Sequence, residues 1–312
     1  MKGNVMSVSV KKLFKYVFDS NYRLILQINQ GKFDHLDDET YLKLKFKACL
    51  GRDLNLEDPR SFNEKLQWIK LHDRDPKYTM MVDKYLVRDY IREKLGEEYL
   101  IPLIGAWDSP DEIDFDSLPD QFVLKCNHNS GLGMYICRDK SKMDIKQVKH
   151  DLRLGISQDY FLTGREWPYK NVSRKIICEQ FLINNTEHDL KDYKIQCFNG
   201  KIDHAFVCVG RSDPQNIRYY YFDEDWNALP YSVNECNDKD FLASLKPQTW
   251  EQMKAIANKL CEGIPEIRVD LYEVNGRIYF GELTLFTSSG FDDTITTAAD
   301  YEIGGHFDLP TK

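Results

Sequence analysis

Two strand-like segments, 266–274 and 277–286, are separated by Asn275-Gly276. An Asn-Gly pair between runs of apolar residues is a strong signal for an antiparallel β-hairpin. Charged residues interrupt both apolar runs, as Arg268-Val-Asp270 in the first and Glu282-Leu-Thr284 in the second. Because residues two apart share one face of a strand, each segment places its charged or hydroxyl side chains together. The two segments therefore predict an antiparallel hairpin in which each strand carries charged residues on one face.

Whether the carboxylates of Asp270 and Glu282 share a face depends on the length of the turn. A two-residue loop places Glu282 opposite Val269 and separates the two carboxylates. A three-residue loop that includes Val274, with Gly276 in the left-handed conformation, places Glu282 opposite Arg268 and Asp270 diagonal to it. The sequence leaves both registers open.

Carboxylates within apolar strands need a compensating partner, because burying an unpaired charge is costly. Asp270 and Glu282, with the Thr284 hydroxyl beside them, suit Mg²⁺, which takes one or two carboxylates together with nucleotide phosphates. A salt-bridged strand pair is the alternative. We favour a metal site, with Asp270, Glu282 and Thr284 as candidate ligands.

A second candidate site is the segment from Lys125 to Gly133, in which a strand ends in lysine and a glycine-bearing turn follows. Ser130, Gly131 and Gly133 would let backbone N–H groups approach phosphate oxygens while Lys125 supplies a positive charge. The segment is neither a Walker loop nor a Rossmann fingerprint, because no Gly-Lys-Ser/Thr follows and the next element is a strand. A plain β-hairpin with a glycine turn would have the same sequence.

The remaining pattern predicts an α+β protein with three parts. Residues 1–102 are mainly helical, with one continuous helix expected from Met80 to Leu95. Residues 103–178 form a small α+β lobe and residues 179–312 a larger lobe. Further strands are expected at 122–126, 134–137, 175–183, 192–199, 201–209 and 217–222, and further helices near 141–154 and 248–262.

Composition excludes several classes of protein. The 42 Lys+Arg and 50 Asp+Glu residues give a net charge of −8, which disfavours nucleic acid as a partner. The eight cysteines form no CxxC pair, so we interpret them as reduced core thiols. With no apolar run of membrane-spanning length and no signal peptide, we expect a cytoplasmic protein. The basic amphipathic segment around 10–18 could lie on the inner face of the membrane, although packing on the protein body is favoured.

The order of these motifs resembles that of the ATP-grasp superfamily, and more narrowly its TupA-like branch, the teichuronopeptide-biosynthesis family. The resemblance extends over nearly the whole chain from Phe62. The matching segments are Phe62-Asn-Glu-Lys-Leu-Gln-Trp68, Asp83-Lys-Tyr-Leu-Val-Arg88, Phe122-Val-Leu-Lys-Cys-Asn-His-Asn-Ser-Gly131, Asp192-Tyr-Lys-Ile-Gln-Cys-Phe-Asn-Gly200 and Arg268-Val-Asp-Leu-Tyr-Glu-Val-Asn-Gly-Arg-Ile-Tyr-Phe-Gly-Glu-Leu-Thr284.

The resemblance implies a fold in which two α+β lobes clasp ATP, and it implies roles by position. It places Lys84 near the nucleotide and Lys125 and Lys194 on its phosphates, with the turn of Ser130, Gly131 and Gly133 closing over them. It makes Glu179, Gln180, Phe181 and Leu182 the hinge that holds adenine, and Glu187 the ribose contact. It implies that Arg268 stabilises the transferred phosphoryl group and that Ser289 approaches the acyl substrate. It also implies that Asp270 and Glu282 bind two Mg²⁺ ions. Where the superfamily usually has Asn, this chain has Thr284.

The activity that the resemblance implies is an ADP-forming carboxylate–amine ligase. It would join an amino acid or other small amine to a uronic-acid-type carboxylate of a surface polysaccharide, capsular or teichuronopeptide-like. Three alternatives stay open: a phosphotransferase acting on a glycan, a glycosyltransferase using a nucleotide sugar, and a non-catalytic nucleotide-binding scaffold. The glycosyltransferase hypothesis rests on Asp73-Arg-Asp75 and Asp223-Glu-Asp225, which match the DxD pattern and also suit solvated turns.

Overall fold

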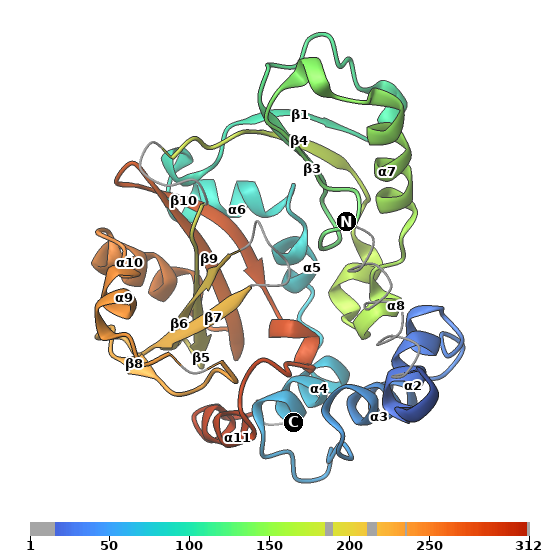
Figure 1. Ribbon diagram of the computed structural model, residues 1–312, viewed down its shortest axis with the longest axis vertical. Coiled ribbons are helices and arrows are strands. Elements are labelled where there is room, and N and C mark those ends of the chain that lie inside the picture. Colours follow the sequence, from blue (N-terminus) through green and yellow to red (C-terminus); the bar gives the residue numbers. More distant parts are fainter. Residues whose placement is uncertain (1–15, 185–189, 211–216, 235, 311–312) are drawn as a thin grey trace, which may run out of the picture.

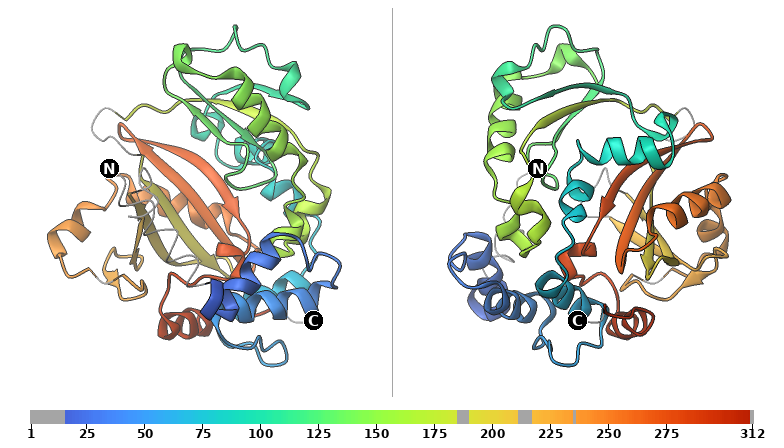
Figure 2. Two further views of the ribbon diagram at one scale, coloured as in Figure 1. Left: turned by 45° about the vertical axis from the view of Figure 1, so that its right-hand side comes forward. Right: turned by 180° about the vertical axis from the view of Figure 1, so that it is seen from behind.

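A computed structural model describes residues 16–184, 190–210, 217–234 and 236–310. These residues form two antiparallel sheets with helices around them, which confirms the predicted α+β class. The small sheet lies at one end of the molecule and the large sheet beside the N-terminal helices (Figures 1 and 2). The first part of the basic segment at 10–18 lies outside the described residues.

The small sheet has the strand order β1-β4-β2-β3. One helix, α7 (Ile145–Ser157), covers one face, where Val148 and Leu152 join the apolar residues of the strands. The opposite face carries Lys125 and Glu179. The strands are β1 (Leu103–Trp107), β4 (Ile176–Gln180), β2 (Phe122–Cys126) and β3 (Tyr135–Cys137).

The large sheet has the order β10-β9-β5-β6-β7-β8, with β9 and β5 inside it. Its core includes the fully buried Ile195, Val269 and Leu271, which lie on one face of the sheet, opposite the face that carries Arg268 and Asp270. The strands are β5 (Asp192–Phe198), β6 (Lys201–Val209), β7 (Arg218–Phe222), β8 (Ala228–Leu229), β9 (Glu266–Val274) and β10 (Arg277–Thr284).

Helices of the N-terminal region pack between the two sheets and below them (Figure 1). Those before the small lobe are α2 (Ser20–Asn29), α3 (Asp38–Leu50), α4 (Phe62–His72), α5 (Lys77–Val82) and α6 (Val87–Lys94). The later helices are α8 (Phe161–Gly164), α9 (Lys239–Ser244), α10 (Trp250–Leu260) and α11 (Thr297–Gly305). No helix within the described ranges is long and apolar enough to cross a membrane.

The lobes are connected through β4. This strand pairs with β1 and β2 along its whole length up to Gln180, so it belongs to the small sheet. A division by sheet membership therefore falls just after Gln180, two residues beyond the expected end of the small lobe at 178. The three-part division of the chain remains a proposal, with β4 assigned to the small lobe.

The helix expected from Met80 to Leu95 is wrong as a single element, because α5 and α6 are separate. Asp83 causes the break: its Oδ1 accepts hydrogen bonds from the backbone N–H of Tyr85 (2.8 Å) and from Asn127 Nδ2 (2.8 Å). The Lys84 N–H donates to the Asn127 carbonyl (3.0 Å) instead of continuing the helix. The break turns Lys84 toward the space between the lobes.

Candidate active site between the lobes

A β-bulge places the charges of β9 and β10 on one face. The turn is the two-residue form, with Asn275 and Gly276 at φ 52° and 75°, and Phe280 pairs with Leu271 as that turn requires. The register then shifts at Gly281, so that Glu282 lies opposite Asp270. The turn alone would have separated the two carboxylates, and the bulge returns them to the same row.

Asp270 lies between two cations at the centre of this face. Arg268 donates to both of its oxygens, Nε to Oδ1 at 2.6 Å and Nη2 to Oδ2 at 2.8 Å. Lys194, on the neighbouring strand β5, contacts Asp270 Oδ2 and lies 2.7 Å from Asp192 Oδ2. Because Asp270 is only 1% exposed, these bonds compensate the loss of its hydration.

Glu282 lies at the open edge of the same cluster. Its Oε2 is 3.2 Å from Lys84 Nζ, and its Oε1 is 3.6 Å from Arg268 Nη2. The Thr284 hydroxyl lies between these groups, 3.0 Å from Arg268 Nη2 and 3.5 Å from Glu282 Oε1. The Lys84 ammonium also donates to the Asn129 carbonyl of the small lobe (3.0 Å), so it bridges the two halves of the site.

The cluster fixes the protonation of its members. Burial alone would raise the pKa of Glu282, but Lys84, Lys194 and Arg268 outweigh it and hold that pKa below its usual range. Burial and Arg268 lower the pKa of Lys194, but Asp192, Asp270 and Glu282 raise it by a larger amount, so the net shift is upward. Glu282 is therefore a carboxylate and Lys194 an ammonium ion at neutral pH.

A second ion-pair cluster lies on the inner face of the small sheet. Lys125 Nζ is 2.6 Å from Glu179 Oε2, and Arg88 Nη1 is 3.1 Å from Glu179 Oε1. Arg88 also donates from Nη2 to the Ile101 carbonyl (2.8 Å), so this arginine ties α6 to the start of the lobe. Glu179, which the resemblance assigns to the adenine hinge, is 6% exposed and orients the two cations.

The glycine turn after β2 packs closely against the end of α7. A Cβ built on Gly133 would lie 2.9 Å from the Gly155 Cα, so only glycine fits at this contact. Asn129 donates from Nδ2 to the Gly155 carbonyl (3.1 Å), and His128 Nε2 lies 3.1 Å from the Gln158 carbonyl. The turn is therefore anchored at both ends, with Ser130 and neighbouring residues exposed between them.

A third cluster lies where the segment after β10 passes the α8 region. Ser289, in η5 (Thr287–Gly290), has a left-handed φ of 55° and donates from Oγ to Glu166 Oε1 at 2.6 Å. Lys70 of α4 is fully buried, and its Nζ donates to the carbonyls of Ser289 (2.6 Å) and Gly164 (2.7 Å). These bonds hold the Ser289 loop against the small-lobe side of the molecule.

These clusters line one cavity of about 730 Å³ between the lobes. The predicted site residues that line it come from both lobes and from the α5–α6 turn: Lys84, Lys125, Ser130, Gly131, Lys194, Arg268, Glu282, Thr284 and Ser289. Asp270 and Glu179 lie directly behind this lining, in contact with its cations. Gly133 supports the turn through its packing on Gly155.

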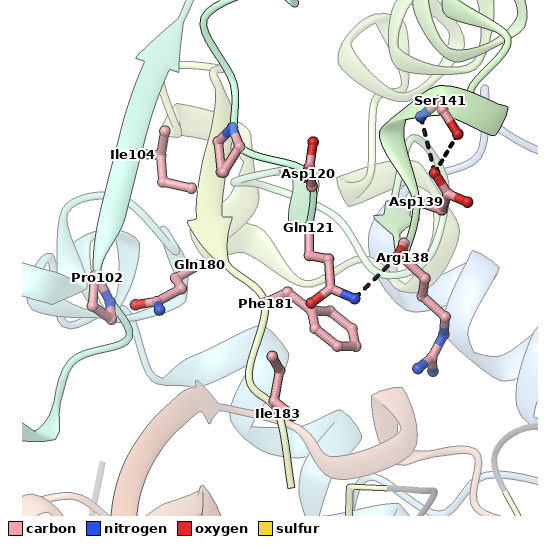
Figure 3. A pocket seen from close by; sticks show the side chains of 11 residues that line it. Pro102, Ile104, Asp120, Gln121, Arg138, Asp139, Ser141, Gln180, Phe181 and Ile183 are labelled. Atoms are coloured by element: carbon pink, nitrogen blue, oxygen red, sulfur yellow. Dashed lines mark hydrogen bonds between the residues drawn. The ribbon is translucent and has the colours of Figure 1, made fainter.

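The predicted adenine-hinge residues Glu179, Gln180, Phe181 and Leu182 are not part of the lining of this cavity. Gln180 and Phe181 line a separate hollow of about 880 Å³ at the hinge, where the Phe181 ring lies under the Arg138 guanidinium at 5.1 Å (Figure 3). Leu182 is half-buried and follows them. Glu187, the predicted ribose contact, lies outside the described residues.

Several lining residues were not predicted from the sequence. Glu166, Tyr160 and Tyr169 belong to the segment between α7 and β4, where no motif is present. Lys70, which lies behind the lining, follows Phe62 and Leu66 at spacings of eight and four residues, so the periodicity of α4 places it on the buried face of that helix. Only the contact of η5 with these segments brings them together, and no spacing within the sequence signals it.

The donor set of this face fits magnesium. Mg²⁺ prefers oxygen ligands and uses one or two carboxylates together with phosphates. Glu282 and Asp270 supply adjacent carboxylates, and Glu282 keeps its charge at neutral pH. Within the described residues no group of three or more His, Cys, Asp and Glu side chains is arranged to hold a metal ion. The face therefore suits an ion shared with a bound nucleotide, whereas it does not suit an all-protein site.

Comparison with solved structures finds distant ATP-grasp ligases. D-alanine–D-alanine ligase from Helicobacter pylori is 14% identical, with 80% of this chain and 68% of that chain covered and a TM-score of 0.43. The Bacillus anthracis enzyme complexed with ATP is also 14% identical, with 86% and 68% covered and a TM-score of 0.42. The ATP-grasp ligase PsnB, complexed with minimal precursor, Mg and ADP, is 11% identical, with 82% and 64% covered and a TM-score of 0.36.

Among curated proteins, none matches the chain. A family model described as TupA-like ATP-grasp matches residues 64–308, which is well over half of the sequence. This match confirms the resemblance noted in the motifs, including the expectation of an ATP-grasp enzyme. The chain belongs to the TupA-like ATP-grasp family.

Proposed function

We propose that this protein is an ATP-dependent carboxylate–amine ligase that forms an amide through an acyl phosphate. Its acceptor would be a uronic-acid-type carboxylate of a bacterial surface polysaccharide, and its nucleophile an amino acid or other small amine. The family supports the ligase chemistry, and the glycan assignment follows the teichuronopeptide association of this branch.

One observation carries the proposal: the bulge at Gly281 brings Glu282 beside Asp270, on the face where Lys84, Lys194 and Arg268 converge. Transfer of a phosphoryl group depends on positioning and on neutralising negative charge. A face with interleaved cations and carboxylates, at the wall of a cavity between two lobes, provides both. A surface salt bridge would not need a bulge to align its charges.

The residues around the proposed nucleotide site have separate roles in this scheme. Lys125, Lys84 and the N–H groups of the glycine turn would bind the triphosphate. Glu282 and Asp270 would hold two magnesium ions, which neutralise phosphate charge when bound. Lys194 would contact the phosphates, and Arg268 would stabilise the γ-phosphoryl group as it is transferred.

The reaction has two steps. A carboxylate oxygen of the acceptor attacks the γ-phosphorus, the bond to the β-phosphate oxygen breaks, and ADP leaves. The amine nitrogen then attacks the acyl carbon, the C–N bond forms, and inorganic phosphate leaves with its electron pair. Water would hydrolyse the acyl phosphate, so we expect the small lobe, about 103–180, to close over the cavity during the reaction.

Two alternatives differ in product. A phosphotransferase would use the same nucleotide site and release a phosphorylated glycan in place of an amide. A glycosyltransferase would bind a nucleotide sugar, but neither DxD segment lines the cavity. Asp73 accepts a hydrogen bond from the Tyr78 hydroxyl (2.7 Å), and Asp223 closes a turn by accepting from the Asp225 N–H (3.0 Å). Both segments are thus explained as turns.

The first test is thermal stability with Mg-ATP. A nucleotide at 100 times its dissociation constant adds about 2.7 kcal/mol to a native state that binds it. We expect a magnesium-dependent stabilisation of wild type that Glu282→Ala loses. Glu251→Ala, which removes an exposed carboxylate of α10, should keep it.

The second test is release of ADP with uronic acids and amines supplied together. Formation of an amide product supports the ligase, and a phosphorylated product without an amide supports the phosphotransferase. Bound ATP with no turnover on any pair would favour the scaffold. Stabilisation by a nucleotide sugar but not by Mg-ATP would overturn the proposal.

Sedimentation with anionic liposomes at low salt tests the peripheral membrane contact proposed for the basic N-terminal segment.

A further inference from the structure

The lining of the cavity between the lobes contains both cations and carboxylates. In the part assigned to the nucleotide, Lys84, Lys125, Lys194 and Arg268 are each paired with a carboxylate. At the other end, around the Ser289 loop, the lining includes two buried carboxylates, which belong to Glu166 and Asp292. The proposed mechanism assigns no role to either carboxylate.

Glu166 is built into this end of the cavity. Its side chain is 5% exposed, and its Oε1 accepts the hydrogen bond from Ser289 Oγ. Within the described residues, its Oε2 accepts no hydrogen bond and joins no ion pair. Gly164 leaves room for this arrangement, because a Cβ there would lie 2.0 Å from Ser289 Oγ and 3.1 Å from Glu166 Oε1.

Lys70 positions the two halves of this pair without contacting the cavity. Its ammonium binds the carbonyl of Gly164, two residues before Glu166, and the carbonyl of Ser289, the serine partner itself. The positive charge of Lys70 favours the carboxylate form of Glu166, although burial is the larger influence and raises the pKa of Glu166. A carboxyl group with a raised pKa is suited to accept a proton near neutral pH.

Aromatic rings complete the surroundings of Glu166. Tyr160 and Tyr169 line the same end of the cavity, with their rings in edge-to-face contact at 4.7 Å. Ring faces attract cations, and the attraction is stronger where water is excluded. Asp292 is 7% exposed and is held by the Thr294 N–H (2.9 Å) and hydroxyl (2.6 Å). This end of the cavity therefore presents two carboxyl groups and two aromatic rings, which are groups that attract a cation.

We propose that Glu166, aided by Asp292 and the Tyr160–Tyr169 rings, binds the amine substrate as an ammonium ion and accepts its proton before attack. This inference rests on the proposed ligase function. The amine gives one proton to Glu166, and its freed lone pair forms the C–N bond as the C–O bond to phosphate breaks. The second proton leaves with the inorganic phosphate. The acceptor carboxylate then lies on the Arg268 side, away from Glu166.

The test compares amines with their N-acetylated counterparts. Ethanolamine, glycinamide and glucosamine are titrated into the protein saturated with Mg-ATP, each beside its N-acetyl derivative, which carries no ammonium charge. We expect at least one amine to bind wild type tenfold or more tightly than its derivative, the discrimination that a hydrogen bond to a charged group supplies. Glu166→Gln should lose this preference, and Glu166→Asp should keep part of it.

The controls separate the possible failures. Glu166→Gln keeps an oxygen that accepts from Ser289, and its stabilisation by Mg-ATP reports that the fold and nucleotide site are intact. Glu262→Gln replaces an exposed carboxylate of the large lobe with a carboxamide, and this variant should behave as wild type. If Mg-ATP binds but no amine is preferred, or the preference persists in Glu166→Gln, the amine site is overturned. If Mg-ATP does not stabilise wild type, the proposed function fails, and the amine site fails with it.

Discussion

Gly281 is the residue on which the shared charged face depends, so Gly281→Ala is the most informative single substitution. A Cβ at this position would lie 3.0 Å from the Asp270 carbonyl oxygen and 3.0 Å from Tyr272 Cε2. Both contacts are closer than normal packing, and neither neighbour can move freely, because one is backbone and the other a ring in the adjacent strand. Overpacking of this kind costs about 1–3 kcal/mol of unfolding free energy.

The substitution should also weaken nucleotide binding. If alanine displaces the bulge, the register of β10 moves by one residue and Glu282 turns to the other face of the sheet. Mg-ATP that adds about 2.7 kcal/mol to wild type would add only about 1.4 kcal/mol to a variant that binds it tenfold more weakly at the same concentration. Urea unfolding with and without Mg-ATP measures both effects.

Gly305→Ala is the matched control, because a Cβ on this last residue of α11 meets no atom within 4 Å and its φ is not left-handed. It should be neutral or stabilise the protein by up to about 1 kcal/mol. A Gly281→Ala protein as stable as wild type, with its full response to Mg-ATP, would refute the argument that this glycine sets the register of the site.

Three further substitutions test other parts of the structure. Burial raises the pKa of Glu266 to about 7 from 4.5, so the stability contributed by its protonated form is full below pH 4.5 and is lost as pH rises through 7. Glu266→Gln should remove about 3 kcal/mol of this change in unfolding free energy between pH 4.5 and pH 7. Unfolding measured across this pH range tests the prediction. Lys70→Met leaves two buried carbonyls without their donor and should cost about 2–4 kcal/mol in urea unfolding, whereas Lys43→Met, at an exposed ion pair, should cost under about 0.5 kcal/mol. Asp83→Ala should lose about 1–2 kcal/mol of unfolding free energy in urea and weaken Mg-ATP binding through Lys84, because the Tyr85 and Leu86 N–H groups lose their acceptor. Asp83→Asn still accepts these bonds and should lose less, and equal losses in both variants would contradict this role of the side chain.

Local patterns are sufficient to predict most of the large sheet. Segments 201–209 and 266–274 are expected as strands, and they form β6 and β9 with those bounds. Their apolar residues and the turns between them are local signals. The Asn275-Gly276 turn is likewise recognisable, and its two-residue form is one of the two registers that the sequence allows.

The features that complete the site depend on contacts between distant residues. The bulge at Gly281 depends on how β10 packs on β9. The alternation of apolar and polar residues along the sequence does not predict this packing. The break before Lys84 depends on Asn127, 44 residues after Asp83, and the Ser289–Glu166 bond joins residues 123 apart. Motifs in the sequence therefore identify many residues of the cavity but not the partners that orient them.

The packing of the glycine turn on α7 has a consequence for binding energetics. A flexible phosphate-binding loop loses conformational entropy when its ligand orders it, and that loss weakens affinity. Here Gly133 already touches Gly155, and Asn127, His128 and Asn129 are buried without any ligand. Most of the ordering takes place when the chain folds. Recognition of phosphate by this turn should therefore involve little conformational adjustment, and exchange of the Asn127 amide, which donates to the Lys175 carbonyl, should be slow even in the free protein.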